Sequence, residues 1–303
     1  MDLNFKSDIK YWLDNLEKLQ PVPTEFCPNL KVESPVKAVI FDIYGTLLIS
    51  SSGDINQASM TTDSMQMALK AGGFKMDGFN NLVYSFLLEQ LPLKIQLNQE
   101  EIKLKGNPYP DVNIFKVWLE LFAEAEKEGL IKLTGHESIA DVIIVFELLS
   151  NKVYPMPGMK EVLLGLKDKG IPLGIVSNAQ FYTPIIMNYF LTGEFSTKQD
   201  IDIFDPELSV FSYKELRAKP DVRLFDKIKL TLQNKYNLQP SDAIFVGNDM
   251  LKDVYTAKNS GLKTALFSGD KRSLRIREND LRVKGIFPDF FINDLKQILQ
   301  IIN

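Results

Sequence analysis

The chain has 303 residues, of which 45% are hydrophobic and 24% charged, and its formal net charge is −4. This composition is typical of a globular protein and argues against a nucleic-acid-binding protein, which would carry a basic domain or stripe. No segment approaches the ~18 consecutive apolar residues of a membrane span, and we expect no membrane insertion. Because single cores rarely grow beyond ~250 to 300 residues, two domains are favoured.

Residues 1–35 are predicted to form a helix followed by a linker. Apolar residues recur at helical spacing in MDLNFKSDIKYWLDNLEKL, with charges between them, unlike the core of a signal peptide. Four prolines between residues 21 and 35 then favour an extended connection. The one cysteine, Cys27, cannot form an internal disulfide, which favours a reducing, cytoplasmic location.

The first strand is predicted in VIFDIYGTLL, where an apolar run ends at Asp42. Residues 53–153 then show helical periodicity with no convincing strand. We therefore expect a core domain formed by residues 36–52 and 154–303, interrupted by an all-helical domain at residues 53–153.

From residue 156 onward, strand-like and helical segments alternate. The strand candidates are IPLGIVSNA, DPELSVFSY, DAIFVGND and LKTALFSGD, and the helical candidates include KPDVRLFDKIKLTLQNKYNL and LKDVYTAKNSG. This alternation is typical of βαβ units, and strands that are apolar throughout favour a parallel sheet covered on both faces. The sequence predicts an α/β fold, with a doubly wound, Rossmann-like sheet and an inserted helical cap.

Polar residues follow three predicted strands, and a lysine precedes a predicted helix. They are Asp42, Tyr44 and Thr46; Ser177 and Asn178; Asn248, Asp249 and Asp253; and Lys219. Ligands of an open parallel sheet bind beyond the carboxyl ends of the strands, and we expect these side chains to share one site. Any one of them could simply form a turn or face solvent, but their joint occurrence favours a site.

These groups suit an anion whose central atom is attacked by a carboxylate. Asp42 would be the nucleophile, and Lys219 would neutralise charge. Ser177 and the Thr46 region would donate hydrogen bonds to anionic oxygens. Asp42 together with Asp249 or Asn248 would offer hard oxygen ligands to Mg²⁺.

Four ordered segments resemble the motifs of the haloacid dehalogenase-like hydrolase superfamily: FDIYGTLL, IVSNAQ, AKPDVRLF and VGNDMLKDVYTAKNSG. The helical insertion resembles the type 1 cap of that superfamily, and the resemblance spans about residues 36–294. It implies that Asp42 forms an aspartyl ester or phosphate, that Ser177 beside Asn178 binds phosphate, and that Lys219 balances charge. It also implies Mg²⁺ as cofactor and a cap that closes over the substrate.

The fourth motif departs from the superfamily pattern, in which Gly-Asp precedes a second Asp. Here Gly247 is followed by Asn248 and then by Asp249. Asp249 is the favoured metal ligand because it is a carboxylate, with Asn248 as the alternative. Asp253 is expected to orient Lys219 or a metal-bound water. By resemblance, the main-chain carbonyl at position 44 is also a metal ligand.

Tyr44 stands where the phosphatases of the superfamily carry a second Asp, which acts as acid and base. A phenol of ordinary pKa ~10 is a poor base near neutrality, and we expect a slow phosphatase. Haloacid dehalogenases carry a tyrosine here, since a halide leaves without a proton. Those enzymes also use a cap arginine, whereas this chain has no arginine before Arg217, and their fourth motif differs.

Three hypotheses follow. The favoured one is a Mg²⁺-dependent phosphatase acting on a small phosphomonoester, the second is a metal-independent dehalogenase, and the third is a non-catalytic protein that binds a phosphorylated ligand or partner. The expected partner is a phosphorylated or halogenated small molecule, with no nucleic acid and no membrane. The sequence leaves the oligomeric state open.

Two further groups of residues have alternative interpretations. Lys94, Lys103, Lys105 and Tyr109 are candidate cap contacts, although lysines are usually solvated. The basic stretch SGDKRSLRIRENDLRVKG is interpreted as an exposed loop, with a phosphate contact from Lys271 or Arg272 as the alternative. The one histidine, His136, is given no catalytic role.

Overall fold

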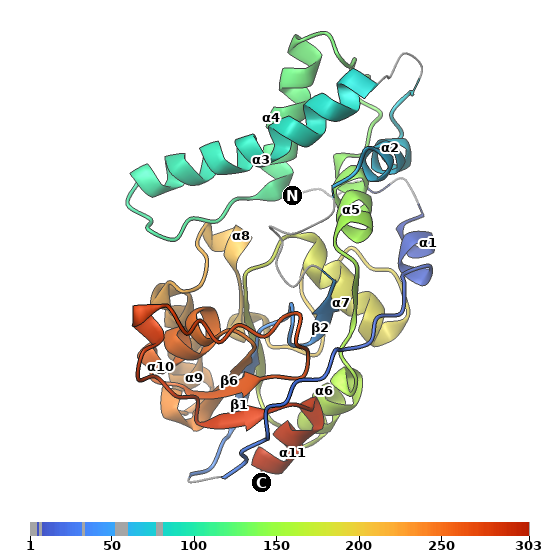
Figure 1. Cartoon of the computed structure of the whole chain (residues 1–303). Helices are drawn as coiled ribbons and strands as arrows, with labels where there is room; N and C mark the ends of the chain where they lie inside the picture. The colour runs from blue at the N-terminus through green and yellow to red at the C-terminus, as the bar shows by residue number, and fades with distance from the viewer. Residues whose placement is uncertain (1–4, 6–7, 32–33, 52–59, 77–80, 303) are drawn as a thin grey trace.

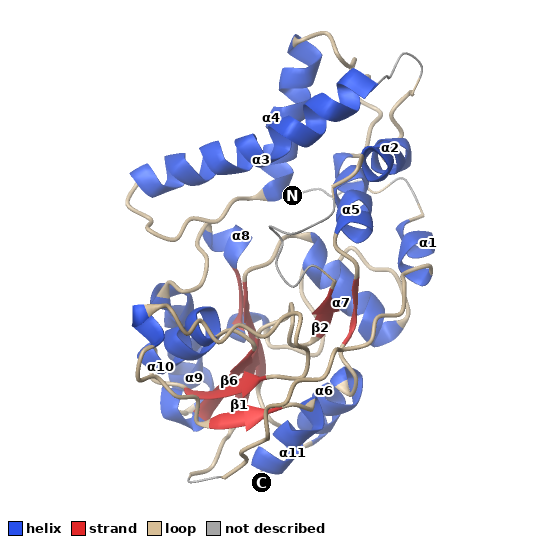
Figure 2. Cartoon of the chain, in the orientation of Figure 1, coloured by secondary structure: helices blue, strands red, loops and turns tan. Residues whose placement is uncertain are grey.

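The computed structural model describes residues 5, 8–31, 34–51, 60–76 and 81–302. Its centre is a parallel sheet of six strands in the order β5-β4-β1-β6-β7-β8 (Figures 1 and 2). The strands are β1 (Ala38–Phe41), β4 (Leu173–Ser177), β5 (Ser209–Phe211), β6 (Ala243–Gly247), β7 (Lys263–Phe267) and β8 (Phe290–Ile292). The strand order reverses beside β1, so that β4 and β6 flank it. The predicted doubly wound sheet is confirmed.

Alternate residues of β1 face opposite sides of the sheet, as the two-residue period of a strand requires. Val39 and Phe41 belong to one hydrophobic core, and Ala38 and Ile40 belong to a second. The first core is covered by α6 (Met159–Asp168), α7 (Tyr182–Thr192) and α11 (Ile298–Ile301), and the second by α9 (Asp226–Tyr236) and α10 (Thr256–Asn259). Both faces are therefore buried, which explains the unbroken apolar runs in the sequence.

Over the described residues 60–76 and 81–150, the insertion contains four helices and no strand. They are α2 (Thr62–Ala71), α3 (Asn81–Leu104), α4 (Ile114–Lys127) and α5 (Ile139–Ser150). Side chains of Thr61, Asn113 and Ser138 cap α2, α4 and α5 by accepting backbone N–H bonds. Figure 1 shows these helices above one edge of the sheet, and the predicted helical cap is confirmed.

Two short antiparallel strands flank the insertion and were not predicted. They are β2 (Leu48–Ser50) and β3 (Val153–Pro155), with Ile49 paired to Tyr154. Three residues are too few for a strand to stand out by its hydrophobic period.

The middle of the insertion is also hydrogen-bonded to the core. The Ala218 amide donates to the Tyr109 carbonyl at 2.8 Å. The Gln180 side chain accepts from the Ile114 amide at 3.0 Å and donates to the Val112 carbonyl at 2.9 Å. The insertion thus meets the core at this loop as well as through β2 and β3.

The N-terminal helix is shorter than predicted. In the described part of the chain α1 covers only Ile9–Asp14, and it buries Ile9 and Leu13. The following segment packs on the core, since the Val22 amide donates to Asp270 at 3.1 Å. Cys27 is exposed. Parts of the predicted helix, residues 1–4 and 6–7, lie outside the described residues.

Two other helical predictions were partly wrong. The stretch after Pro220 forms a 3-10 turn at Val222–Phe225 before α9 begins, because the Asp221 side chain accepts from the Arg223 amide. The stretch after Asp249 opens as a π-helix at Met250–Tyr255 before α10.

Across the described residues, no helix combines the length and hydrophobicity needed to cross a membrane.

Replacing Asp221 with asparagine should lower the free energy of unfolding, and the loss relative to wild type should be larger at pH 7 than at pH 3. Burial raises the pKa of Asp221, but hydrogen bonds from Arg223 and Arg217 outweigh it and lower the pKa to about 2. A carboxyl with a depressed pKa stabilises the fold above its unfolded pKa, and this contribution is lost as pH falls from about 4 toward 2.

Asparagine can still cap the turn but carries no charge. Because Arg223 is 46% exposed, we expect a loss of only about 1 kcal/mol at pH 7. Urea unfolding of both proteins at pH 7, 5 and 3 measures it. A difference that stays constant over this range would contradict the prediction.

Candidate active site

The carboxyl ends of β1, β4 and β6 meet where the strand order reverses, and a cavity of about 90 Å³ lies there. The residues that line it are Asp42, Tyr44, Asn178, Lys219, Asn248, Asp249, Lys252, Asp253, Arg275 and Arg277. Seven of the nine residues proposed from the sequence are among them. Thr46 and Ser177 are not.

Lys219 joins two of the carboxylates that line this cavity. Its Nζ lies 2.9 Å from Asp42 Oδ1 and 2.6 Å from Asp253 Oδ1, and its side chain is 2% exposed. The Lys219 amide donates to Asn178 Oδ1 at 2.8 Å, which fixes the loop to the end of β4. The arrangement agrees with the orienting role proposed for Asp253.

Opposing effects act on the charges of this trio. Burial lowers the pKa of Lys219, but the carboxylates of Asp253 and Asp42 outweigh it and raise the pKa above its ordinary value. Burial raises the pKa of Asp253 to about 7, although Lys219 opposes the shift. Lys219 is therefore cationic at neutral pH, next to the carboxylate that the sequence proposes as nucleophile.

Two glycines let the backbone pass close to these side chains. Gly45 has a φ of 79°, and a Cβ there would lie 2.6 Å from Ser273 Cβ and 2.7 Å from Asn248 Nδ2. A Cβ on Gly247 would lie 2.4 Å from Asp253 Cγ. A larger residue at either position would displace the turn after β1 or the carboxylate on Lys219.

Thr46 and Ser177, which do not line the cavity, are both buried but differ in their hydrogen bonding. The buried Thr46 hydroxyl donates to Asn248 Oδ1 at 3.1 Å, which ties the turn after β1 to the loop after β6. Ser177 Oγ is buried and has no hydrogen-bond partner among the described residues. An unsatisfied buried hydroxyl is uncommon, and it is consistent with a missing ligand oxygen.

Tyr44 is half-buried and its hydroxyl lies 2.8 Å from Thr183 Oγ1. Burial raises the pKa of Tyr44 well above its ordinary value, and the charges of Glu147 and Asp42 add to this shift. The phenol is therefore neutral throughout the physiological range and cannot accept a proton from water.

Asp249 pairs with Arg277. Arg277 Nη2 lies 2.6 Å from Asp249 Oδ2, and Nε lies 3.2 Å from both carboxylate oxygens. Burial raises the pKa of Asp249, but the bonds from Arg277 outweigh it and lower the pKa. Asn248 accepts from Thr46 and donates to the Ser273 carbonyl at 2.6 Å, so its amide is already engaged.

The donor groups fit Mg²⁺ in type and number. The carboxylates of Asp42 and Asp249 line the same cavity, and protein sites commonly hold Mg²⁺ by one or two carboxylates plus waters. Within the described part of the chain, no three His, Cys, Asp or Glu side chains are grouped as a metal site. A metal here would thus depend on these two carboxylates, a main-chain carbonyl and solvent.

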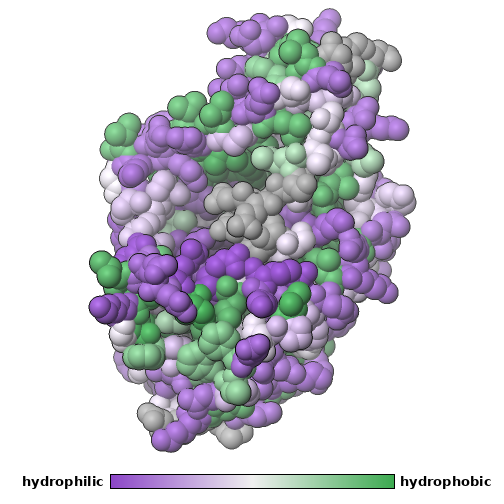
Figure 3. Space-filling model, in the orientation of Figure 1, coloured by the Kyte–Doolittle hydropathy of each residue, from purple (hydrophilic) through white to green (hydrophobic). Residues whose placement is uncertain are grey.

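Lys252, Arg275 and Arg277 also line the cavity and were not predicted from the sequence. The Arg275 amide donates to the Asn248 carbonyl at 3.0 Å, and the Arg275 carbonyl accepts from the Met250 amide at 2.8 Å. These bonds fold the loop after β7 against the cavity. In Figure 3 a hydrophilic band crosses the middle of the face at the level of this loop. The run of basic residues was the available signal, but it could not say which side chains turn inward.

Lys271 and Arg272, the alternative phosphate contacts, do not line the cavity. Arg272 instead pairs with the buried Asp270, at 3.0 Å, and bonds the Gln20 carbonyl. Lys271 is exposed.

The four candidate cap contacts, Lys94, Lys103, Lys105 and Tyr109, differ in what they contact. Lys94 and Lys105 pair with glutamates of the insertion, at 2.7 and 2.6 Å, and Lys103 is exposed. Tyr109 alone of the four reaches the core, through its carbonyl and through its hydroxyl, which accepts from Arg282 at 3.4 Å. His136 is exposed in a loop of the insertion.

A model of the haloacid dehalogenase-like hydrolase family matches residues 36–261, which is most of the chain. The chain belongs to this family. The match covers the sheet from β1 to β6, the helical insertion and every residue proposed for the site, and the resemblance stated from the four motifs is confirmed.

Two curated relatives of the haloacid dehalogenase-like chain are named glyceraldehyde 3-phosphate phosphatase. That of Pyrococcus furiosus is 29% identical over 147 residues, which is 48% of this chain and 54% of the relative. That of Pyrococcus abyssi is 28% identical over 116 residues, 38% of this chain and 43% of the relative. The chain spans about half the length of these relatives or less.

A solved structure supports the fold of this family member. The 2-haloacid dehalogenase of Pseudomonas syringae pv. Tomato DC3000 superposes with a TM-score of 0.55, over 88% of this chain and 98% of that one. The two share 18% sequence identity, and the likeness therefore concerns the fold and not the reaction.

Proposed function

We propose that the protein is a Mg²⁺-dependent phosphatase that acts on a small phosphomonoester through an aspartyl-phosphate intermediate at Asp42. The observation that carries the proposal is the buried trio in which Lys219 holds Asp42 and Asp253 at the edge of a cavity rich in cationic side chains. The glyceraldehyde 3-phosphate phosphatases that match part of the chain support a phosphorylated substrate.

In the first step, an oxygen of Asp42 forms a bond to phosphorus and the bond from phosphorus to the alcohol oxygen breaks. Lys219 is placed to balance the charge of Asp42 and of the transferring group. The Ser177 hydroxyl is available to donate to a phosphoryl oxygen. Mg²⁺, held by Asp42, Asp249 and the main-chain carbonyl of Tyr44, would supply further positive charge at the phosphoryl group.

In the second step, water attacks the phosphorus of the aspartyl phosphate, inorganic phosphate leaves and the Asp42 carboxylate is restored. The departing alkoxide and the attacking water exchange protons with solvent, because the phenol of Tyr44 has a raised pKa and is bonded to Thr183. The proposed enzyme is therefore slow, as general acid-base help is typically worth 10²- to 10⁴-fold.

The test is hydrolysis of an aryl phosphate by the purified protein, with Mg²⁺ and with a chelator. Turnover that requires Mg²⁺ supports the proposal. The dehalogenase alternative is favoured by one observation, the tyrosine at position 44, and release of halide from a short haloacid in the presence of chelator would establish it. Phosphate binding without turnover of either substrate would support the non-catalytic alternative.

Replacing Tyr44 with phenylalanine should leave kcat for the aryl phosphate within about 3-fold of wild type, since the hydroxyl transfers no proton. Tyr44→Asp should raise kcat by about 10-fold or more, because a carboxylate there can protonate the leaving oxygen and then accept a proton from water. Steady-state kinetics of both variants measure this. A large loss in Tyr44→Phe would show that the phenol takes part in the reaction.

A further inference from the structure

Arg277 holds the carboxylate that the proposed function assigns to Mg²⁺. Its Nε and Nη2 contact both oxygens of Asp249, at 2.6 to 3.2 Å. A guanidinium bound in this way occupies the lone pairs that a metal would use. We propose that Arg277 competes with the divalent cation for Asp249 and thereby sets the metal affinity of the site. This inference rests on the proposed function.

The position of Arg277 is fixed by its backbone. The two hydrogen bonds of Arg275 attach the loop to the residues on either side of Asp249. Arg277 itself has a φ of 60°, in the left-handed region that long side chains rarely adopt. Such a conformation persists only where surrounding contacts hold it. The loop geometry thus places the start of the Arg277 side chain within reach of Asp249.

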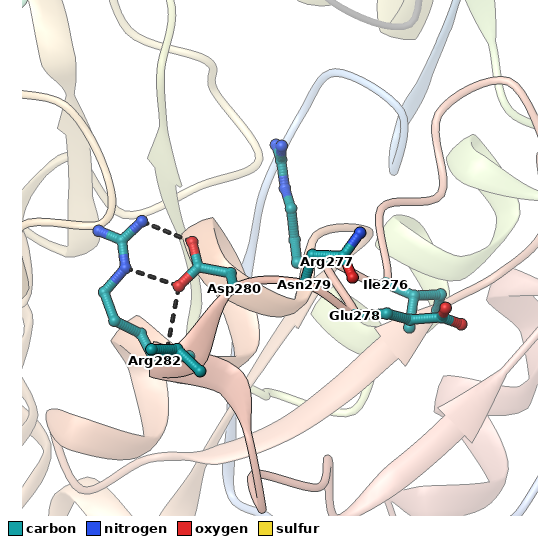
Figure 4. Close-up of a pocket in the computed structure, with 7 residues that line it drawn as sticks. Ile276, Arg277, Glu278, Asn279, Asp280 and Arg282 are labelled. Atoms are coloured by element: carbon teal, nitrogen blue, oxygen red, sulfur yellow. Dashed lines mark hydrogen bonds and ion pairs between the residues drawn. The ribbon is translucent and has the colours of Figure 1, made fainter.

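The Arg277 guanidinium also has open space into which it can move when it leaves Asp249. Arg277 lines the small cavity with Asp42, and it lines a second, open cavity of about 860 Å³ formed by residues 276–282. Figure 4 shows its side chain extended away from the Asp280–Arg282 ion pair of the same loop. The Arg277 side chain is 32% exposed, whereas that of Asp249 is 7% exposed. Arg277 can leave Asp249 toward solvent without moving the core.

Charge repulsion prevents Asp249 from binding the metal and Arg277 at the same time. A divalent cation on Asp249 and a guanidinium on the same carboxylate are like charges a few ångströms apart, in a site where Asp249 is buried. Metal binding therefore requires that the ion pair break, and the stability of that pair is subtracted from the apparent affinity for the metal.

Titration calorimetry with MgCl₂ and, separately, MnCl₂ tests the proposal on wild type, Arg277→Gln and Lys252→Gln. Lys252 lines the same cavity, so Lys252→Gln removes the same charge, but no bond from its ammonium group to Asp249 is present in the described structure. We expect Arg277→Gln to bind the metal roughly tenfold more tightly than wild type, and Lys252→Gln to change the affinity by about 2-fold or less. Arg277→Lys, which keeps the charge but not the planar fork, should fall between.

An unchanged or weaker affinity in Arg277→Gln would overturn the proposal, provided that its thermal unfolding midpoint matches that of wild type. Equal tightening by Lys252→Gln would also overturn it, because net charge alone would then be the cause. If metal binds equally to all the proteins, only the competition fails. If no variant binds metal at millimolar concentration, the metal-dependent function fails with it.

Discussion

Asp42→Asn should lower kcat for aryl phosphate hydrolysis by at least about 10³-fold, because an amide oxygen does not attack phosphorus at a useful rate. The side chain keeps its size, and Lys219 retains Asp253 at 2.6 Å, so the fold and much of the binding energy should survive. KM should change much less than kcat. The loss therefore reports the covalent step and not the collapse of the site.

A matched control is available at the opposite edge of the sheet. Asp289 precedes β8, pairs with Lys258 at 2.9 Å and accepts a hydrogen bond from the Thr264 amide. Asp289→Asn therefore makes the same chemical change far from the strand ends that bear Asp42. It should leave kcat within about 2-fold of wild type. Acid quenching during turnover should trap phosphate on the peptide containing Asp42 in wild type and not in Asp42→Asn. Undiminished turnover by folded Asp42→Asn would remove Asp42 from the reaction.

Lys219→Met should lower the free energy of unfolding at pH 7.5 by about 3 to 5 kcal/mol, because it leaves two buried carboxylates without their cation. Lys219 and Asp253 are each 2% exposed, and Asp42 is 10% exposed. The same substitution should abolish measurable turnover. Urea unfolding followed by circular dichroism measures the loss of stability.

The double variant Lys219→Met with Asp253→Asn should recover part of the lost stability, since only one buried charge then lacks a partner. The deficit of the single variant should also shrink between pH 7.5 and pH 5, because unpaired buried carboxyls have raised pKa values and take up protons over that range. As a control, Lys235→Met removes an ammonium group that is 41% exposed and should cost only a small part of the stability. A loss of that size for Lys219→Met would refute the argument from burial.

The strand ends could be predicted because a parallel sheet brings them together by its topology. An apolar run precedes each of Asp42, Asn178, Asp249 and Asp253. Because the parallel strands end at the same edge of the sheet, these residues line one cavity. Lys219 could be added from its motif, although no strand ends beside it.

Arg277 could not be predicted in this way. Its inward direction depends on a positive φ and on hydrogen bonds between the loop after β7 and the loop after β6, neither of which leaves a periodic pattern in the sequence. The short strands β2 and β3 and the 3-10 turn after Asp221 were missed for a similar reason: segments of three or four residues are decided by their surroundings and not by their own hydrophobic period.

The hydrogen bonds that join Tyr109, Val112 and Ile114 to the core restrict how a substrate can enter. A lid attached at one edge swings as a single body about its hinge strands, but this insertion is also fastened between α3 and α4, to Ala218 and Gln180. Swinging it open as a unit would break all three bonds at once. Access to Asp42 that keeps these bonds would therefore require rearrangement within the insertion and not rotation of the whole insertion about β2 and β3.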